Sequence, residues 1–208
     1  MPEKKANNKF ILYACIASLI IFFILLVGSL KGGFFLPVDN WVYSQNAAMY
    51  KPVIPVIMLL ITSIMSLQGA IMLSAIAFSV LLSQKKARQA WFLVISLVAC
   101  YVFWESAKFL VQRLRPEIRL AAASGFSFPS GHAATAAVFF GLMIYLFKDE
   151  FKSVIGKRIF IVVCAIIALL VSYSRIYLGV HWLSDVLAGI ALGVFIATAA
   201  VLVMNHKL

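Results

Sequence analysis

The sequence predicts an all-α protein, a polytopic membrane bundle with six transmembrane helices. The chain has 208 residues, of which 64% are hydrophobic and only 12% are charged. Average proteins are roughly 45–50% apolar and about 25% charged. The mean hydropathy is +1.04, and apolar runs recur that approach or exceed the roughly 20 helical residues needed to cross a bilayer. We therefore expect one membrane domain over residues 1–208.

Six apolar segments are the candidate spans: Phe10–Leu30, Val53–Ser83, Ala90–Gln112, Ala133–Phe147, Ile159–Tyr173 and Leu183–Met204. The first is about twice as long as the apolar region of a signal peptide, so we expect it to be retained. The second is too long for one upright span and predicts a tilt or a break near Ser66–Gly69. The fourth and fifth are short, so flanking residues are expected to extend them.

Basic residues between the spans predict the orientation. One face carries Lys4, Lys5, Lys9, Lys85, Lys86, Arg88, Lys148, Lys152, Lys157, Arg158 and Lys207. The other carries Lys31, Lys51, Lys108, Arg113, Arg115, Arg119 and Arg175. The first face is the richer one, which predicts a plasma membrane protein with both termini in the cytoplasm. The net charge of +11 thus fits an anionic leaflet and not nucleic acid.

The connector from Lys31 to Lys51 alternates aromatic and polar side chains, such as Trp41 and Asp39. Such a segment is expected to lie in the headgroup layer. An anchoring belt is the favoured interpretation, and a gate for a lipid headgroup is the alternative.

Ionisable side chains gather in three blocks at ends of spans, where they are costly and therefore suggest function. In the first block, Lys108 and Arg115 are seven residues apart, two helical turns, and share a face if the helix continues. Pro116 makes Arg115 a candidate helix end. An ammonium and a guanidinium suit phosphate oxygens. The alternative is that these are snorkelling side chains, which place their charge in water at the membrane interface.

The second block is Pro129-Ser130-Gly131-His132, directly before an apolar helix. Free backbone amides at such a terminus bind anions. Ser130 adds a hydroxyl donor, and Gly131 permits close approach to the backbone. His132 is suited to donate a proton to a departing alkoxide.

The third block is Ser174-Arg175 followed by His181 and Asp185. The last two are four residues apart and are expected on one helix face, where the carboxylate orients the imidazole. A structural His–Asp pair is the simpler alternative. Arg175 is placed to neutralise charge on a transferring group. The predicted orientation places all three blocks on the face opposite the termini, which is the outer face of the membrane. This placement predicts one site that binds and transfers a phosphoryl group.

Together, Lys108-x6-Arg115-Pro116, Pro129-Ser130-Gly131-His132 and Ser174-Arg175-x5-His181-x3-Asp185 resemble the three-part signature of the type 2 phosphatidic acid phosphatase superfamily. The parts occur in order, within residues 108–185. The six-span layout is similar to the membrane branch of that family, and in particular to its bacterial phosphatidylglycerophosphate phosphatase B group.

This resemblance implies residue roles. His181 is expected to be the nucleophile that forms a phosphohistidine, with Asp185 orienting it. His132 is expected to protonate the leaving alcohol and then activate water. The phosphoryl oxygens are expected to bind Lys108, Arg115, Ser130, the Gly131 amide and Arg175. No metal and no cofactor are expected, and Glu105 is expected to pair with Lys108.

The expected function is hydrolysis of the terminal phosphate of phosphatidylglycerophosphate. The expected partners are this membrane phospholipid, as substrate, and the lipid bilayer. The alternatives are an undecaprenyl pyrophosphate phosphatase and a broad lipid phosphate phosphatase. A lipid transporter and an assembly protein are the candidates from other classes. No nucleic acid and no obligate protein partner are expected.

Overall fold

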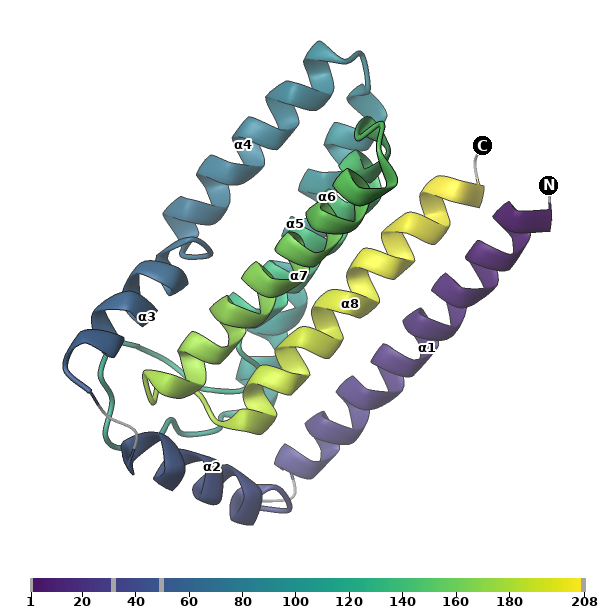
Figure 1. Ribbon diagram of the computed structural model, residues 1–208. Coiled ribbons are helices and arrows are strands. Elements are labelled where there is room, and N and C mark those ends of the chain that lie inside the picture. Colours follow the sequence, from purple (N-terminus) through teal and green to yellow (C-terminus); the bar gives the residue numbers. More distant parts are fainter. Residues whose placement is uncertain (1, 31–32, 49–50, 207–208) are drawn as a thin grey trace.

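The computed structural model describes residues 2–30, 33–48 and 51–206, and the regular elements in these ranges are helices (Figure 1). They are α1 (Pro2–Leu30), α2 (Leu36–Ala48), α3 (Val53–Ser63), α4 (Leu67–Ser83), α5 (Ala87–Val111), α6 (Gly131–Phe147), the 3₁₀ turn Lys148–Glu150, α7 (Val154–Tyr177) and α8 (Leu183–His206). The predicted all-α bundle is confirmed.

Five helices in the described ranges are long and apolar enough to cross a membrane, and there are six such spans if the bent pair of α3 and α4 is counted as one. The two members of the pair meet at 45°. The predicted break in this segment is confirmed, because α4 restarts after Ser66, whose Oγ accepts a 3.2 Å hydrogen bond from the amide of Gly69. The short fourth and fifth segments are extended, as expected, to begin at Gly131 and Val154. Large apolar side chains cover the outer surface of the bundle, so the chain is a membrane protein.

Helix α8 is the centre of the bundle and packs most extensively on α1 and α6. Two glycines four residues apart on α8 let α6 approach closely, as small residues do between membrane helices. A Cβ on Gly189 would lie 2.4 Å from the carbonyl oxygen of Ser130, and one on Gly193 would lie 2.5 Å from that of Ala134. This contact places the start of α6 against the start of α8.

The connector between the first two spans contains α2, which packs on α7 and α8. Phe34 and Trp41 are exposed, whereas the Asp39 side chain is only 1% exposed. The connector therefore does more than anchor the chain in the headgroup layer, because Asp39 makes a buried polar contact with the bundle. Lys31 and Lys207, which were used to predict the orientation, lie outside the described residues, as do the side chains of Lys4 and Lys5.

The chain ends lie together at one end of the bundle, and α2 lies at the other (Figure 1). Because α6 and α8 run from the α2 end toward the ends of the chain, both helices begin at the end of the bundle where α2 lies. The three polar blocks thus converge at the end of the bundle away from the chain ends.

Candidate active site

A cavity of about 730 Å³ brings six of the predicted site residues together: Lys108, Arg115, Gly131, His132, Arg175 and His181. The other two, Ser130 and Asp185, are 0% exposed. They lie directly behind the wall of the cavity, next to Gly131 and in contact distance of His181. The structure therefore brings residues of all three blocks together around one cavity.

Lys108 occupies the last turn of α5. Its Nζ lies 4.2 Å from the centre of the Trp104 ring and 3.8 Å from Oε1 of Glu105. The predicted pairing with Glu105 is thus present. The indole face and the carboxylate hold the ammonium at the cavity.

The helix does not continue from Lys108 to Arg115, so the condition for a shared helix face is not met. Helix α5 ends at Val111, and Gln112 adopts a left-handed conformation with φ 50°. Arg115 therefore follows in a loop. Both cations still reach the cavity, because the loop turns back across the end of the bundle.

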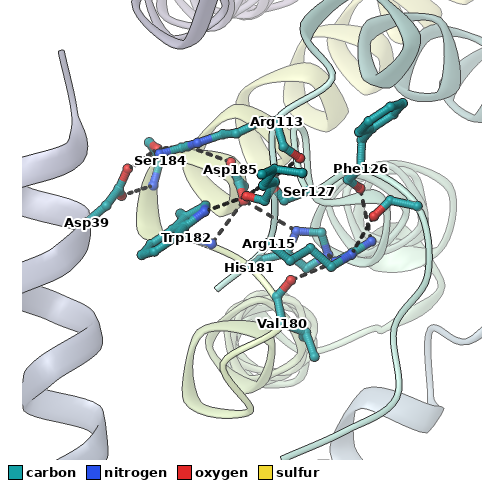
Figure 2. A network of polar contacts seen from close by, with 12 residues as sticks. Asp39, Arg113, Arg115, Phe126, Ser127, Val180, His181, Trp182, Ser184 and Asp185 are labelled. Carbon is teal, nitrogen blue, oxygen red and sulfur yellow. Dashed lines mark hydrogen bonds and ion pairs between the residues drawn. The ribbon is translucent and has the colours of Figure 1, made fainter. Parts of the chain in front are cut away.

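The guanidinium of Arg115 is held by backbone carbonyls at two sides (Figure 2). It donates hydrogen bonds to the carbonyls of Ser124, Gly125, Phe126 and Val180 at 2.6–3.0 Å. Its Nη1 also lies 3.1 Å from Nε2 of His181. Burial lowers the pKa of Arg115 below its usual value, and the nearby Asp185 carboxylate opposes that shift. A guanidinium held by neutral carbonyls keeps its charge available for an anion.

The contact with Arg115 determines the tautomer of His181. A guanidinium only donates, so Nε2 must accept with its lone pair, and the ring proton is on Nδ1. Burial lowers the pKa of His181 to about 4, against the opposing effect of Asp185. The imidazole is therefore neutral near pH 7, with a nucleophilic lone pair at the cavity.

Asp185 lies on the other side of that ring, but the predicted geometry needs correction. Helix α8 begins at Leu183, so His181 precedes the helix and shares no helix face with Asp185. The Nδ1–Oδ2 distance is 3.6 Å, too long for a hydrogen bond. Oδ2 instead accepts a 2.9 Å hydrogen bond from the amide of Trp182. A carboxylate in the first turn that binds the amide just before the helix is half of a capping box.

Ser130 begins α6, and its amide donates a 2.9 Å hydrogen bond to the carbonyl of Asp185. Its hydroxyl does not cap the helix and has no hydrogen-bond partner among the described residues. Gly131 lies against the indole of Trp104, where a Cβ would come within 3.1 Å of the ring. The second block is thus held between α8, through the hydrogen bond of Ser130 to Asp185, and α5, through the contact of Gly131 with Trp104.

Three residues of this region were missed by sequence reasoning: Asp39, Arg113 and Thr62. Arg113 donates to Asp185 Oδ1 at 2.7 Å and to Asp39 Oδ2 at 2.6 Å. The sequence gives only weak indications of their role, because Arg113 is one of several basic residues on the same face. Asp39 is the single acid of its connector, and Thr62 lies inside an apolar run.

The same cavity has a long apolar arm between α4 and α5. It is lined by residues that include Leu67, Ile71, Ala75 and Phe78 of α4 and Trp91, Val94, Val98 and Tyr101 of α5. Trp91 and Lys108 are separated by 17 positions of one helix, about 26 Å. The cavity thus joins a cationic end to an apolar arm, which fits an amphiphile with a phosphate group.

Comparisons with known proteins agree with this geometry. The phosphatidylglycerophosphatase B of Bacillus subtilis is 40% identical over 89 residues, which are 41% of this chain and 43% of that protein. The undecaprenyl-diphosphatase of Sulfolobus acidocaldarius is 36% identical over 119 residues, 52% of each chain. The chain thus spans about half the length of these curated relatives.

Among solved structures, a transmembrane PAP2-type phosphatidylglycerolphosphate phosphatase from Bacillus subtilis superposes with a TM-score of 0.87. The match covers 94% of this chain and 98% of that one at 24% identity, so it shows a shared fold. The family model that matches residues 89–208, more than half of the chain, is the PAP2 superfamily. That region contains all three polar blocks and the whole cationic end of the cavity, and the chain belongs to the PAP2 superfamily.

Proposed function

We propose that the protein is an integral membrane lipid phosphatase that hydrolyses the terminal phosphate of phosphatidylglycerophosphate through a phosphohistidine. The observation that carries this proposal is the cavity that joins His132, His181 and three cations to an apolar arm. The cationic end suits a phosphoryl group, and the arm suits the chains of a lipid that stays in the bilayer. The family and the Bacillus subtilis relative support the same activity.

In the proposed reaction, Nε2 of His181 attacks phosphorus while the bond from phosphorus to the lipid oxygen breaks. His132 gives its proton to the departing alkoxide. Before the attack, Arg115 exchanges its contact with Nε2 for a phosphoryl oxygen, which frees the lone pair, and Lys108 and Arg175 bind the remaining charge. Ser130 and the Gly131 amide are the further proposed ligands of the phosphoryl group.

The second half of the reaction releases phosphate. His132, now neutral, removes a proton from water, and the oxygen of that water attacks phosphorus. The phosphorus–nitrogen bond breaks, and its electron pair returns to Nε2 of His181. The Asp185 carboxylate, 3.6 Å from Nδ1, stabilises the positive charge that the imidazole gains during each transfer.

The direct test is phosphate release from phosphatidylglycerophosphate in detergent without divalent metal. We expect turnover by the native chain, competitive inhibition by vanadate and no turnover by His181→Ala. Absence of phosphate release, or full activity of His181→Ala, would refute the proposal. Failure of vanadate to inhibit would favour the transporter or the assembly protein.

A second substrate, undecaprenyl pyrophosphate, is favoured by one observation, the similarity to the archaeal undecaprenyl-diphosphatase. Its reaction would use the same residues, with a lipid monophosphate in place of the alkoxide as leaving group. Kinetics on both lipids decide between the two. We expect the higher kcat/KM for phosphatidylglycerophosphate, and a large preference for the polyprenyl lipid would reverse this assignment.

We further propose that the site faces the outside of the plasma membrane and that both chain ends are cytoplasmic. This proposal is supported by the basic residues in the loops near the chain ends, such as Lys85 and Lys152. Glu117 and Lys85 are exposed at opposite ends. A membrane-impermeant maleimide added to intact cells is expected to label Glu117→Cys and not Lys85→Cys. The reverse pattern would contradict the orientation.

A further inference from the structure

Behind His181, a buried cluster of charges connects Asp185 to α2 (Figure 2). Arg113 is its centre and donates to three side chains. Nη1 binds Asp185 Oδ1 at 2.7 Å and Ser184 Oγ at 2.6 Å, and Nη2 binds Asp39 Oδ2 at 2.6 Å. The side chains of Asp39 and Asp185 are 1% and 0% exposed. None of these contacts involves a group that lines the cationic end of the cavity.

We propose that Arg113 and Asp39 are a positioning pair that sets the orientation of the Asp185 carboxylate toward His181. This inference rests on the proposed function, because it concerns how the nucleophile of that reaction is held. Neither residue belongs to the three blocks, and Asp39 lies outside the region that the family model matches.

The two carboxylate oxygens of Asp185 have different partners. Arg113 binds Oδ1, so Oδ2 is left to face Nδ1 of His181 and the amide of Trp182. A carboxylate bound at both oxygens cannot rotate freely about its last torsion. Without Arg113, the buried charge of Asp185 would lose its cation, and breaking such a pair is strongly destabilising to the ionised form.

The guanidinium of Arg113 is itself held in place. Asp39 holds the far side of the guanidinium, and its oxygens also accept from the amide and hydroxyl of Ser184 at 2.9 and 2.7 Å. Asp39 therefore caps α8 from another helix, with favourable charge at the helix start. The backbone of Arg113 is also held, because its carbonyl accepts from the amide and hydroxyl of Ser127.

Together these contacts join three separate parts of the chain at Arg113, two at its guanidinium and one at its backbone carbonyl. Helix α2 contributes Asp39, the first turn of α8 contributes Asp185, and the loop before α6 contributes Ser127. The Trp182 ring covers the guanidinium at 5.5 Å. A lysine has one charged atom and cannot bind two carboxylates along two edges in this way.

The experiment compares Arg113→Gln, Arg113→Lys, Asp39→Asn and the double variant Asp39→Asn/Arg113→Gln with the native chain. Arg88→Gln is the matched control. It also removes an arginine that bonds a carbonyl and lies over an aromatic ring, but at the far end of α5. Each variant is purified in detergent, its thermal unfolding is recorded, and kcat and KM are measured on phosphatidylglycerophosphate.

We expect Arg113→Gln to lower kcat about 100-fold and Asp39→Asn about 10-fold, the scale of losses when groups behind a reactive histidine are removed. KM should stay within about twofold, because neither side chain lies at the cationic end of the cavity. Arg113→Lys should recover part of the lost kcat. The double variant should resemble Arg113→Gln alone, because residues that act as a unit are not additive.

The inference fails if Arg113→Gln behaves like Arg88→Gln, or if the two single losses in kcat multiply in the double variant. If Arg113→Gln does not fold, Arg113→Lys carries the test, and unchanged kcat in that variant overturns the inference. Failure of the proposed function looks different. If the proposed function is wrong, the native chain releases no phosphate. If only the inference about Arg113 and Asp39 is wrong, the native chain is active and His181→Ala is not.

Discussion

Nη1 of Arg175 donates a 2.7 Å hydrogen bond to Oγ1 of Thr62, which joins the last turn of α7 to the end of α3. The two residues are 6% and 7% exposed. Nε of Arg175 has no hydrogen-bond partner among the described residues. Thr62 thus binds one amino group of the guanidinium and leaves the edge with Nε for phosphoryl oxygens. It also lies next to the break between α3 and α4, whose residue Met65 lines the cavity.

Thr62→Val should weaken the binding of phosphate and vanadate while the chain stays folded. The substitution keeps the shape and removes the hydroxyl, and a hydrogen bond to a charged group contributes roughly 1.5–3 kcal/mol. We expect inhibition constants to rise about 10-fold or more. Thr62→Ser keeps the hydroxyl and should bind like the native chain. Equal inhibition constants for the two variants would show that Arg175 does not depend on this bond.

The two histidines should differ in their response to the leaving group. An aryl phosphate with an acidic phenol needs no proton donor, whereas a lipid alcohol does. His132→Ala should therefore release a stoichiometric burst of the phenol and then stop, because water is not activated. His181→Ala should show no burst and a loss in kcat of at least about 1,000-fold. Rapid-mixing absorbance measures both, and a burst from His181→Ala would exclude it as nucleophile.

The pH dependence of kcat/KM should be bell-shaped, with its acidic limb far below the usual range of histidine. The pKa of His181 is lowered to about 4, so the nucleophile loses its lone pair only at strongly acidic pH. The alkaline limb is expected from the group that donates the proton in the proposed reaction. Initial rates between about pH 3 and 9 measure both limbs. An acidic limb centred near the ordinary histidine value of about 6.5 would contradict the buried, neutral state.

Stability should fall as the pH falls, and His181 should account for part of the loss. Its pKa is about 4 in the folded chain and about 6.5 when unfolded. Between these values the unfolded chain binds the extra proton, so the contribution of His181 is complete above about pH 6.5 and is lost toward pH 4. Thermal unfolding of His181→Gln should depend less steeply on pH in this window. Equal slopes would assign the effect to other groups.

The apolar arm of the cavity should affect only substrates that have chains. Ala75 is exposed on α4 and lines the arm, so Ala75→Phe should narrow it without disturbing the core. We expect KM for the lipid to rise roughly 10-fold, because each buried methylene is worth about 0.8 kcal/mol. KM for a short aryl phosphate should not change. Ala17→Phe, which places the same ring on the surface of α1, is the control. A similar rise with that variant would argue against binding of chains in the arm.

Much of the site could be predicted because its residues are costly in a membrane and are close in sequence to the ends of spans. Lys108, His132, Arg175 and His181 stood out for that reason, and they line one cavity. Details that depend on where a helix stops could not be predicted. Arg115 lies beyond the end of α5, so the condition for a face shared with Lys108 is not met, and His181 precedes α8, so the expected helix face shared with Asp185 is wrong.

The composition and spacing of apolar residues alone determined that this chain forms a bundle of membrane helices, because an apolar run of about 20 residues crosses a bilayer as a helix whose backbone groups bond one another. They also determined which polar residues meet at one end, since successive spans alternate in direction. Only the tertiary structure decided which atoms face one another. That Arg113 joins Asp39 to Asp185 depends on how α2 folds onto α8, and that Arg175 meets Thr62 depends on the break after α3. Such contacts between residues distant in the chain follow from packing, which no local spacing encodes.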